Sequence, residues 1–217
     1  MPDRLITLSD PRAPAAEAYR TLRTNLIFSN VDAHLNTIAI TSPSQGEGKS
    51  VTLANLAVVL AQSEHQTLIV DADLRRPTQH ELWGVDNDEG LTSMLLDERA
   101  LQSPAIHSTD VEGLGLLTSG PLPANPADVL ASQKMDAVIA RLSEMADFIL
   151  FDVPPVLAVS DAAILGRRLA GVLLVVKAGT TRRDPTARAR DQLQRVGANL
   201  IGAVLTNAPR NTRAYYG

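Results

Sequence analysis

The segment TSPSQGEGKS, Thr41 to Ser50, decides the fold of this 217-residue chain. An apolar run precedes it and a helical pattern follows it, which is typical of a turn between a strand and a helix. Backbone N–H groups of such a turn converge on an anion, and the amino end of the helix adds partial positive charge. Gly46 and Gly48 allow a close backbone approach that a Cβ atom would block. The segment predicts a phosphate-binding loop, although Pro43 stands where the G-x-x-x-x-G-K-[ST] pattern has its first glycine.

The loop also predicts how a nucleotide is held. Lys49 would reach the outer phosphates, and the Ser50 hydroxyl would ligate Mg²⁺. The expected nucleotide contacts in the loop are Gln45, Gly46, Glu47, Gly48, Lys49, Ser50 and Val51. A glycine-containing turn without a ligand is the weaker alternative, because the GxGKS pattern in this context is specific.

Carboxylates follow two other apolar runs. Asp71 ends TLIVD, Asp73 lies two residues further, and Asp152 ends FILFD. Ligands of an open parallel sheet bind beyond the carboxyl ends of its strands, so we expect these acids beside the loop. They can hold Mg²⁺ directly or through water and accept a proton from an attacking hydroxyl, whereas helix capping is the alternative role. The predicted catalytic residues are Lys49, Asp71, Asp73 and Asp152, and the predicted metal ligands are Ser50, Asp71 and Asp152. Arg75 and Arg76 either add positive charge there or lie in solvent.

Short apolar runs alternate with longer helical patterns along the chain. The predicted strands are Thr37–Thr41, Thr67–Asp71, Leu114–Leu117, Phe148–Asp152, Val172–Val176 and Ile201–Thr206. The predicted helices are Ala15–Phe28, Ser50–Gln62, Pro126–Ser132, Met135–Met145, Ser160–Arg167 and Thr186–Val196, with loops at Gly84–Gly90 and Thr118–Asn125. Such alternation predicts an α/β P-loop NTPase, a mostly parallel sheet with helices on both faces. We expect an amino-terminal segment with a helix (1–35), one domain (36–208) and a flexible tail (209–217).

Composition limits the classes of function. A net charge of -4 and a pI of about 5.5 argue against a general nucleic-acid surface, which needs a basic face. The chain has no cysteine, which fits a reducing cytoplasm. No apolar run approaches the roughly 18 residues of a membrane helix, and the first residues lack the pattern of a secretory signal. We therefore expect a cytoplasmic protein that reaches a membrane only through a partner.

Five segments resemble the bacterial tyrosine kinases, the BY-kinases of capsular and exopolysaccharide production. These segments are TSPSQGEGKS, LIVDADLRRP, ILFDVPPVLAVSDA, AEAYRTLRTNLIFS and SGPLPANPADVLASQKM. The resemblance implies transfer of the γ-phosphate of ATP, with Mg²⁺, to tyrosines of the chain's own tail, Tyr215 and Tyr216. The family usually ends in a longer run of tyrosines, and Val153 replaces the Ser or Thr that often follows the aspartate equivalent to Asp152.

The resemblance also implies partners. It assigns Glu17, Arg20 and Arg23 to self-association into a ring, whereas their spacing alone favours local pairing on a solvated helix. It further implies a separate transmembrane activator that recruits the kinase to the inner face of the membrane, and a tyrosine phosphatase. Asn207 is a candidate adenine contact, and a turn-forming role is at least as good an interpretation.

The nearest competing class shares the fold. Septum-site and partition ATPases have a deviant loop, K-G-G-x-G-K-[ST], whose signature lysine aligns with Ser44 here. The absence of that lysine argues against a positioning ATPase, although a non-kinase assembly ATPase stays as the alternative function. A metal-cluster carrier would need a C-x-x-C pair, and a purely structural subunit would not need the whole set of loop and acidic residues.

Overall fold

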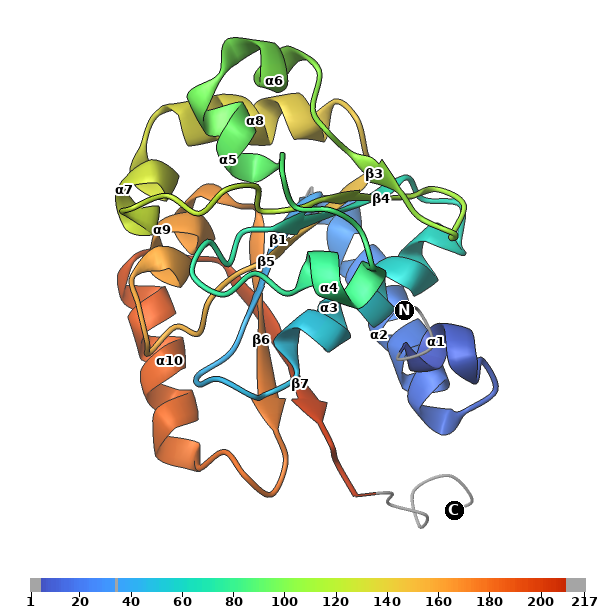
Figure 1. Ribbon diagram of the computed structural model, residues 1–217. Coiled ribbons are helices and arrows are strands. Elements are labelled where there is room, and N and C mark those ends of the chain that lie inside the picture. Colours follow the sequence, from blue (N-terminus) through green and yellow to red (C-terminus); the bar gives the residue numbers. More distant parts are fainter. Residues whose placement is uncertain (1–4, 34, 210–217) are drawn as a thin grey trace.

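The computed structural model describes residues 5–33 and 35–209, which form a seven-stranded sheet with helices on both faces (Figure 1). The strand order is β3-β4-β2-β5-β1-β6-β7, and all neighbouring pairs are parallel except β3 and β4. The strands are β1 (Thr37–Thr41), β2 (Thr67–Asp71), β3 (His107–Ser108), β4 (Leu114–Leu117), β5 (Phe148–Asp152), β6 (Gly171–Lys177) and β7 (Leu200–Thr206). The predicted α/β architecture is confirmed.

Helices cover both faces of the sheet, and they pack against it through two aliphatic cores. The helices are α1 (Ile6–Ser9), α2 (Pro14–Ala33), α3 (Lys49–Ala61), α4 (Gln79–Trp83), α5 (Leu91–Leu96), α6 (Glu98–Gln102), α7 (Pro126–Ala131), α8 (Lys134–Ser143), α9 (Asp161–Arg168) and α10 (Arg183–Arg195). One core joins the sheet to α1, α2 and α3, and the other joins it to α5 and α7 to α10. Every residue of β1, β2 and β5 is buried, because these central strands are covered on both sides.

The longer elements lie where the sequence pattern predicts them. Each of the six predicted strands is present, and β6 and β7 extend beyond the predicted limits. Most helix limits differ from the prediction by one or two residues, and two differ by more. Helix α10 begins at Arg183 because Pro185 fits its first turn, where no N–H donor is needed. Helix α2 continues to Ala33, five residues past the predicted end.

The pattern missed the short elements. These are α1, α4, α5, α6 and β3, each too short to show a helical or strand period.

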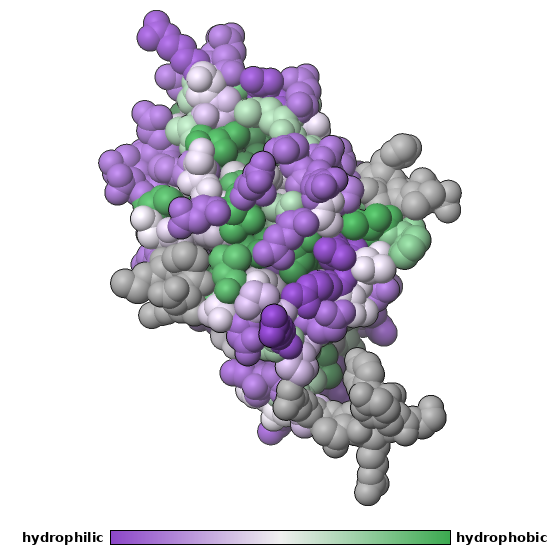
Figure 2. Space-filling model, turned by 90° about the vertical axis from the view of Figure 1, so that its right-hand side faces the viewer, coloured by the Kyte–Doolittle hydropathy of each residue, from purple (hydrophilic) through white to green (hydrophobic). Residues whose placement is uncertain are grey.

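Figure 2 shows that hydrophilic residues cover most of the visible face, with apolar residues in smaller areas between them. Within the described ranges, no helix combines the length and the apolar character that crossing a bilayer requires.

Candidate active site

The phosphate-binding loop joins β1 to α3 at the carboxyl edge of the sheet. Gly46 and Gly48 have φ values of 76° and 87°, a left-handed conformation that favours glycine. Their backbone N–H groups have no hydrogen-bond acceptor within residues 5–33 and 35–209. A Cβ atom at Gly46 would meet nothing within 4 Å, so this part of the loop borders open space. The loop and the amino end of α3 therefore form a cradle for an anion.

Glu47 anchors this loop to the neighbouring strands. Its side chain is buried, and its Oε2 accepts hydrogen bonds from the backbone N of Lys177 at 2.6 Å and the hydroxyl of Thr181 at 2.5 Å. Its backbone oxygen accepts a bond from the Thr206 hydroxyl at 2.8 Å. Glu47 was predicted as a nucleotide contact, but its side chain holds the loop against β6 and its backbone oxygen holds it against β7.

Lys49 brings the predicted catalytic acids together. Its Nζ lies 2.8 Å from Oδ1 of Asp152 and 3.0 Å from Oδ2 of Asp73. Burial lowers the pKa of the Lys49 ammonium, but the charges of Asp152 and Asp73 outweigh burial and hold this pKa above its usual value. Lys49 is therefore a charged group beside the anion cradle, and Ser50 Oγ lies 3.4 Å from the same Nζ.

Asp71 lies behind this ion-pair cluster and is fully buried. Its two oxygens accept backbone N–H groups from Asp73 at 3.2 Å and from Thr78 and Gln79 at 2.9 Å each. Burial raises the pKa of Asp71 to about 8, and the neighbouring Asp152 adds to this rise. The backbone hydrogen bonds and Lys49 oppose it. Asp71 and Asp152 are register partners on adjacent strands, which explains their proximity.

The two arginines after this segment have different surroundings. Arg75 makes a bidentate pair with Asp161, with Nε and Nη2 at 2.9 and 3.0 Å from its two oxygens. Asp161 is fully buried at the start of α9, so the pair ties the segment after β2 to that helix. Arg76 instead borders the loop, with Nη1 at 3.4 Å from Oε1 of Gln45. Of the two, Arg76 is the one placed to add positive charge to the site.

A cavity of about 450 Å³ lies in front of the cradle. Predicted site residues that line it are Gln45, Gly46, Gly48, Lys49, Ser50, Val51 and Asp73. Arg76 lines it too, whereas Asp71 and Asp152 lie deeper, behind Lys49. The exposed Asn207 lines a different groove, between α2 and β7, and its φ of 52° is typical of a turn-forming asparagine.

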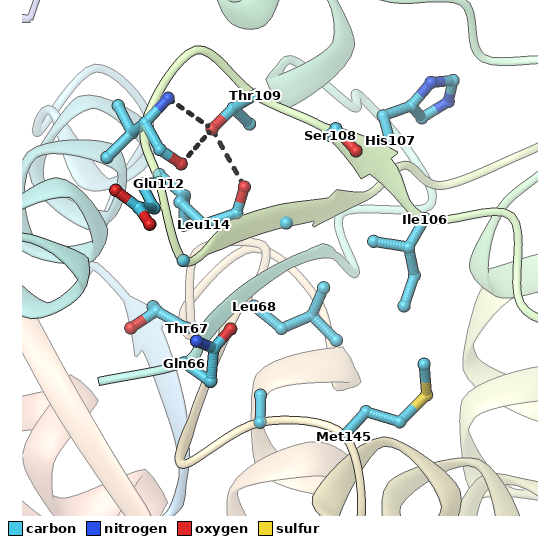
Figure 3. Close-up of a pocket in the computed structure, with 14 residues that line it drawn as sticks. Gln66, Thr67, Leu68, Ile106, His107, Ser108, Thr109, Glu112, Leu114 and Met145 are labelled. Atoms are coloured by element: carbon cyan, nitrogen blue, oxygen red, sulfur yellow. Dashed lines mark hydrogen bonds between the residues drawn. The ribbon is translucent and has the colours of Figure 1, made fainter. Parts of the chain in front are cut away.

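A second hollow, of about 400 Å³, lies at the amino ends of β2 and β4 (Figure 3). Gln66, Ile106 and Met145 line it, together with other residues near β3. None of the predicted site residues is among those that line it. Because the strands run parallel, this hollow is at the opposite edge of the sheet from the phosphate-binding loop.

The donor set fits a magnesium nucleotide. The cradle offers free backbone N–H groups and a lysine ammonium to phosphate oxygens. Ser50 supplies a hydroxyl at the first turn of α3, 3.4 Å from the Lys49 Nζ that also pairs with Asp152. Asp71 and Asp152 offer carboxylate oxygens of the kind that Mg²⁺ prefers. Both oxygens of Asp152 already accept a hydrogen bond, so this residue is best suited to hold the ion through water.

We predict that Gly48→Ala weakens the binding of Mg-ATP at least about tenfold, because a left-handed residue with a Cβ distorts the cradle. The strain should also lower the free energy of unfolding by about 1 kcal/mol. Gly197→Ala is the matched control, since Gly197 has a φ of 74° and open space around it, far from the loop in sequence. Calorimetric titration should show normal affinity in the control despite similar destabilisation. Equal affinities in both variants would contradict the cradle.

The three predicted interface residues lie on α2 and have partners within the chain. Nη1 of Arg20 lies 2.6 Å from the Glu17 carboxylate, and Nη2 of Arg20 donates to the backbone oxygen of Pro11. Arg23 donates to the backbone oxygen of Val59 in α3 at 3.2 Å. The local pairing that the spacing favours is therefore present. Tyr215 and Tyr216 lie outside the described residues.

Comparison with known proteins identifies the family. A family model described as AAA domain matches residues 35–177. The tyrosine-protein kinase YwqD of Bacillus subtilis is 40% identical over 217 residues, covering 100% of this chain and 91% of that protein. The chain belongs to the bacterial tyrosine kinase family. The solved kinase domain of the Escherichia coli tyrosine kinase ETK matches this tyrosine kinase with a TM-score of 0.89 and 34% identity, covering 98% of this chain and 84% of that one. The chimerical protein CapA2B2 matches with a TM-score of 0.89 and 38% identity, over 95% and 90% of the two chains.

The competing class is more distant from this tyrosine kinase. The septum-site-determining protein MinD of Pyrococcus horikoshii, solved with Mg-ADP, has a TM-score of 0.65 and 28% identity. The match covers 78% of this chain and 69% of that one. The predicted relation to the septum-site ATPases is therefore confirmed for the fold. The membership in the tyrosine kinase family, also predicted, makes this chain a protein-tyrosine kinase.

Proposed function

We propose that this chain transfers the γ-phosphate of Mg-ATP to tyrosine hydroxyls, first on Tyr215 and Tyr216, in the control of capsular or exopolysaccharide production. The observation that carries the proposal is Lys49, a charged and half-buried side chain paired with Asp73 and Asp152 beside a cradle of free backbone N–H groups. Phosphoryl transfer asks mainly for positioned reactants and positive charge around the transferred group. Lys49 and the cradle supply both.

The arrangement suggests a role for each acid. Asp73 lines the cavity, so its carboxylate is placed to accept the proton that a tyrosine hydroxyl loses on attack. The bond between the γ-phosphorus and the bridging oxygen of ADP breaks as the tyrosine oxygen bonds to phosphorus. Asp71 and Asp152 are buried behind Lys49, where with Ser50 they would hold Mg²⁺, which neutralises phosphate charge when bound. We propose Asn207 as an adenine contact beyond this site.

Tail tyrosines are the preferred acceptors for a chemical reason. The chain has three tyrosines, and the third, Tyr19, lies on α2 and packs partly buried against the core. Burial raises the pKa of its hydroxyl, against a smaller opposing effect of Thr52. A hydroxyl held in this way is hard to bring to a neighbouring cavity. We propose a division into an amino-terminal segment (1–35), a kinase domain (36–208) and a tail (209–217) that carries the two acceptor tyrosines.

The proposed partners follow from the family resemblance. We propose a ring in which Glu17, Arg20 and Arg23 exchange part of their internal bonds for contacts with a neighbour. Head-to-tail contacts of this kind close into cycles and would bring the tail of one subunit to the cavity of the next. A separate transmembrane activator would recruit the kinase to the inner face of the membrane, and a tyrosine phosphatase would reverse the reaction.

The test is mass spectrometry of the intact protein after incubation with Mg-ATP, with and without a membrane activator. We expect phosphate on Tyr215, Tyr216 or both, and none on Tyr19. In the double variant Tyr215→Phe and Tyr216→Phe, phosphorylation of the chain should disappear, while phosphorylation of an added tyrosine peptide continues. Phosphate release from ATP without phosphotyrosine in any substrate would instead support an assembly ATPase.

A further inference from the structure

Gln79 is a buried polar residue at the centre of the site that the loop and acid motifs do not include. It is the first residue of α4, its relative exposure is 0%, and it lies between the two strands that carry Asp71 and Asp152 and the start of α3. Its backbone N–H donates to Oδ2 of Asp71 at 2.9 Å. Its side-chain Nε2 donates to Oδ2 of Asp152 at 2.8 Å and to the backbone oxygen of Ser50 at 3.2 Å. One residue thus contacts three elements of the proposed metal and phosphate site.

The orientation of the Gln79 amide is determined by its neighbours. Asp152 and the Ser50 backbone oxygen can only accept hydrogen bonds, so the amide nitrogen must face them. The amide oxygen faces the indole Nε1 of Trp83, which can only donate and lies at 3.3 Å. If the amide were reversed, its oxygen would face two acceptors, and its NH₂ group would face the indole N–H donor. Trp83 therefore locks the amide in the one orientation that satisfies every group.

This locked amide limits how Asp152 can turn. Oδ2 of Asp152 is held by Gln79, which leaves Oδ1 to face Lys49 at 2.8 Å. The bond to the Ser50 backbone oxygen ties the same amide to the residue whose hydroxyl is the expected magnesium ligand. A partner that orients a ligating carboxylate typically accounts for a 10- to 100-fold effect on metal affinity or activity.

We propose that Gln79 is a positioning residue that holds Asp152 and Ser50 in the arrangement needed for magnesium-dependent phosphoryl transfer, with Trp83 fixing its amide. This inference rests on the proposed function and adds a residue to its machinery. Gln79 acts through Asp152 and Ser50 and does not itself line the cavity. Because α4 lies in the segment after Asp73, the same contacts link Mg²⁺ binding to the position of α4.

The test compares Gln79→Met, which keeps the length of the side chain but removes both donors, with wild type. Isothermal titration with ADP at increasing Mg²⁺ should show a half-saturating Mg²⁺ concentration about 10-fold higher or more in the variant. Binding of ADP without Mg²⁺ should stay within about twofold, since the cradle is intact. In the kinase assay, kcat should fall at least about 10-fold with a smaller change in the KM for ATP.

A spectroscopic readout is available because Trp83 is the chain's single tryptophan. Mg-ADP should change its fluorescence in the wild type, and this change should be much smaller in Gln79→Met. Gln79→Glu is a second variant for the case that Gln79→Met does not fold. It keeps the size but presents an acceptor to Asp152 and the Ser50 oxygen, so kcat should fall at least as far. Gln62→Met, at an exposed position after α3, is the matched control and should behave as wild type.

The outcomes separate this inference from the proposed function. If wild type forms no phosphotyrosine but the Mg²⁺ requirement of ADP binding rises in Gln79→Met, the kinase proposal fails and the role of Gln79 stands. If the folded Gln79→Met and Gln79→Glu variants keep the Mg²⁺ requirement, the fluorescence change and the kcat of wild type, the positioning role is wrong.

Discussion

Replacing Lys49 by methionine is expected to lower the rate of phosphotyrosine formation by about 10³-fold or more, because it removes the cation that faces the transferred phosphate. Methionine keeps the length of the side chain but cannot pair with Asp73 and Asp152, which lie 3.0 and 2.8 Å from the ammonium. The measurement is the initial rate of phosphotyrosine formation, with mass spectrometry to locate the phosphate. The acceptor tyrosines should be unmodified in the variant under conditions that modify wild type.

Stability is the necessary second measurement for this variant. Loss of the cation leaves the two buried carboxylates of Asp73 and Asp152 without their common partner, so Lys49→Met should also have a lower free energy of unfolding than wild type. Lys134→Met removes an exposed lysine at the start of α8 and is the matched control. It should keep full activity. A folded Lys49→Met protein with more than about a tenth of the wild-type rate would contradict the assigned role.

Asp71→Asn is expected to flatten the dependence of stability on pH in the protein without nucleotide. The folded-state pKa of Asp71 is raised to about 8, whereas an unfolded chain has a value near 3.9. Between these values the folded protein binds an additional proton, so its free energy of unfolding falls as pH rises through that window. From pH 5.5 to 8.5 this loss is at most about 3 kcal/mol in wild type and is absent in the variant.

Urea unfolding at several pH values, without Mg²⁺, measures this difference. Burial and the charge of Asp152 hold the pKa of Asp71 high, so removing the Asp71 carboxylate should remove the slope. Asp110→Asn, at an exposed position before β4, should keep the slope of wild type. A wild-type curve parallel to that of Asp71→Asn between pH 5.5 and 8.5 would show that burial does not hold a proton there.

The fold was predictable because its main signals are local. The aliphatic strands and the loop segment each carry a periodic pattern or a turn that a short window contains. Pairing of β2 with β5 then brings Asp71 and Asp152 together, because each is the last residue of its strand and the two strands are parallel neighbours. The short helices were missed for the opposite reason. Helix α4 has five residues, and no period is visible over that length.

The sequence by itself determined the phosphate-binding loop, the parallel sheet, the acids beside the loop and the resemblance to a kinase family, since these depend on residue type and spacing. Only the tertiary structure decided which way each side chain turns. It directs Glu47 into the sheet edge, pairs Arg75 with Asp161, and places Gln79 between Asp152 and Ser50. These contacts join residues 29 to 130 positions apart. They follow from packing and hydrogen-bond satisfaction across the folded core, which no local pattern contains.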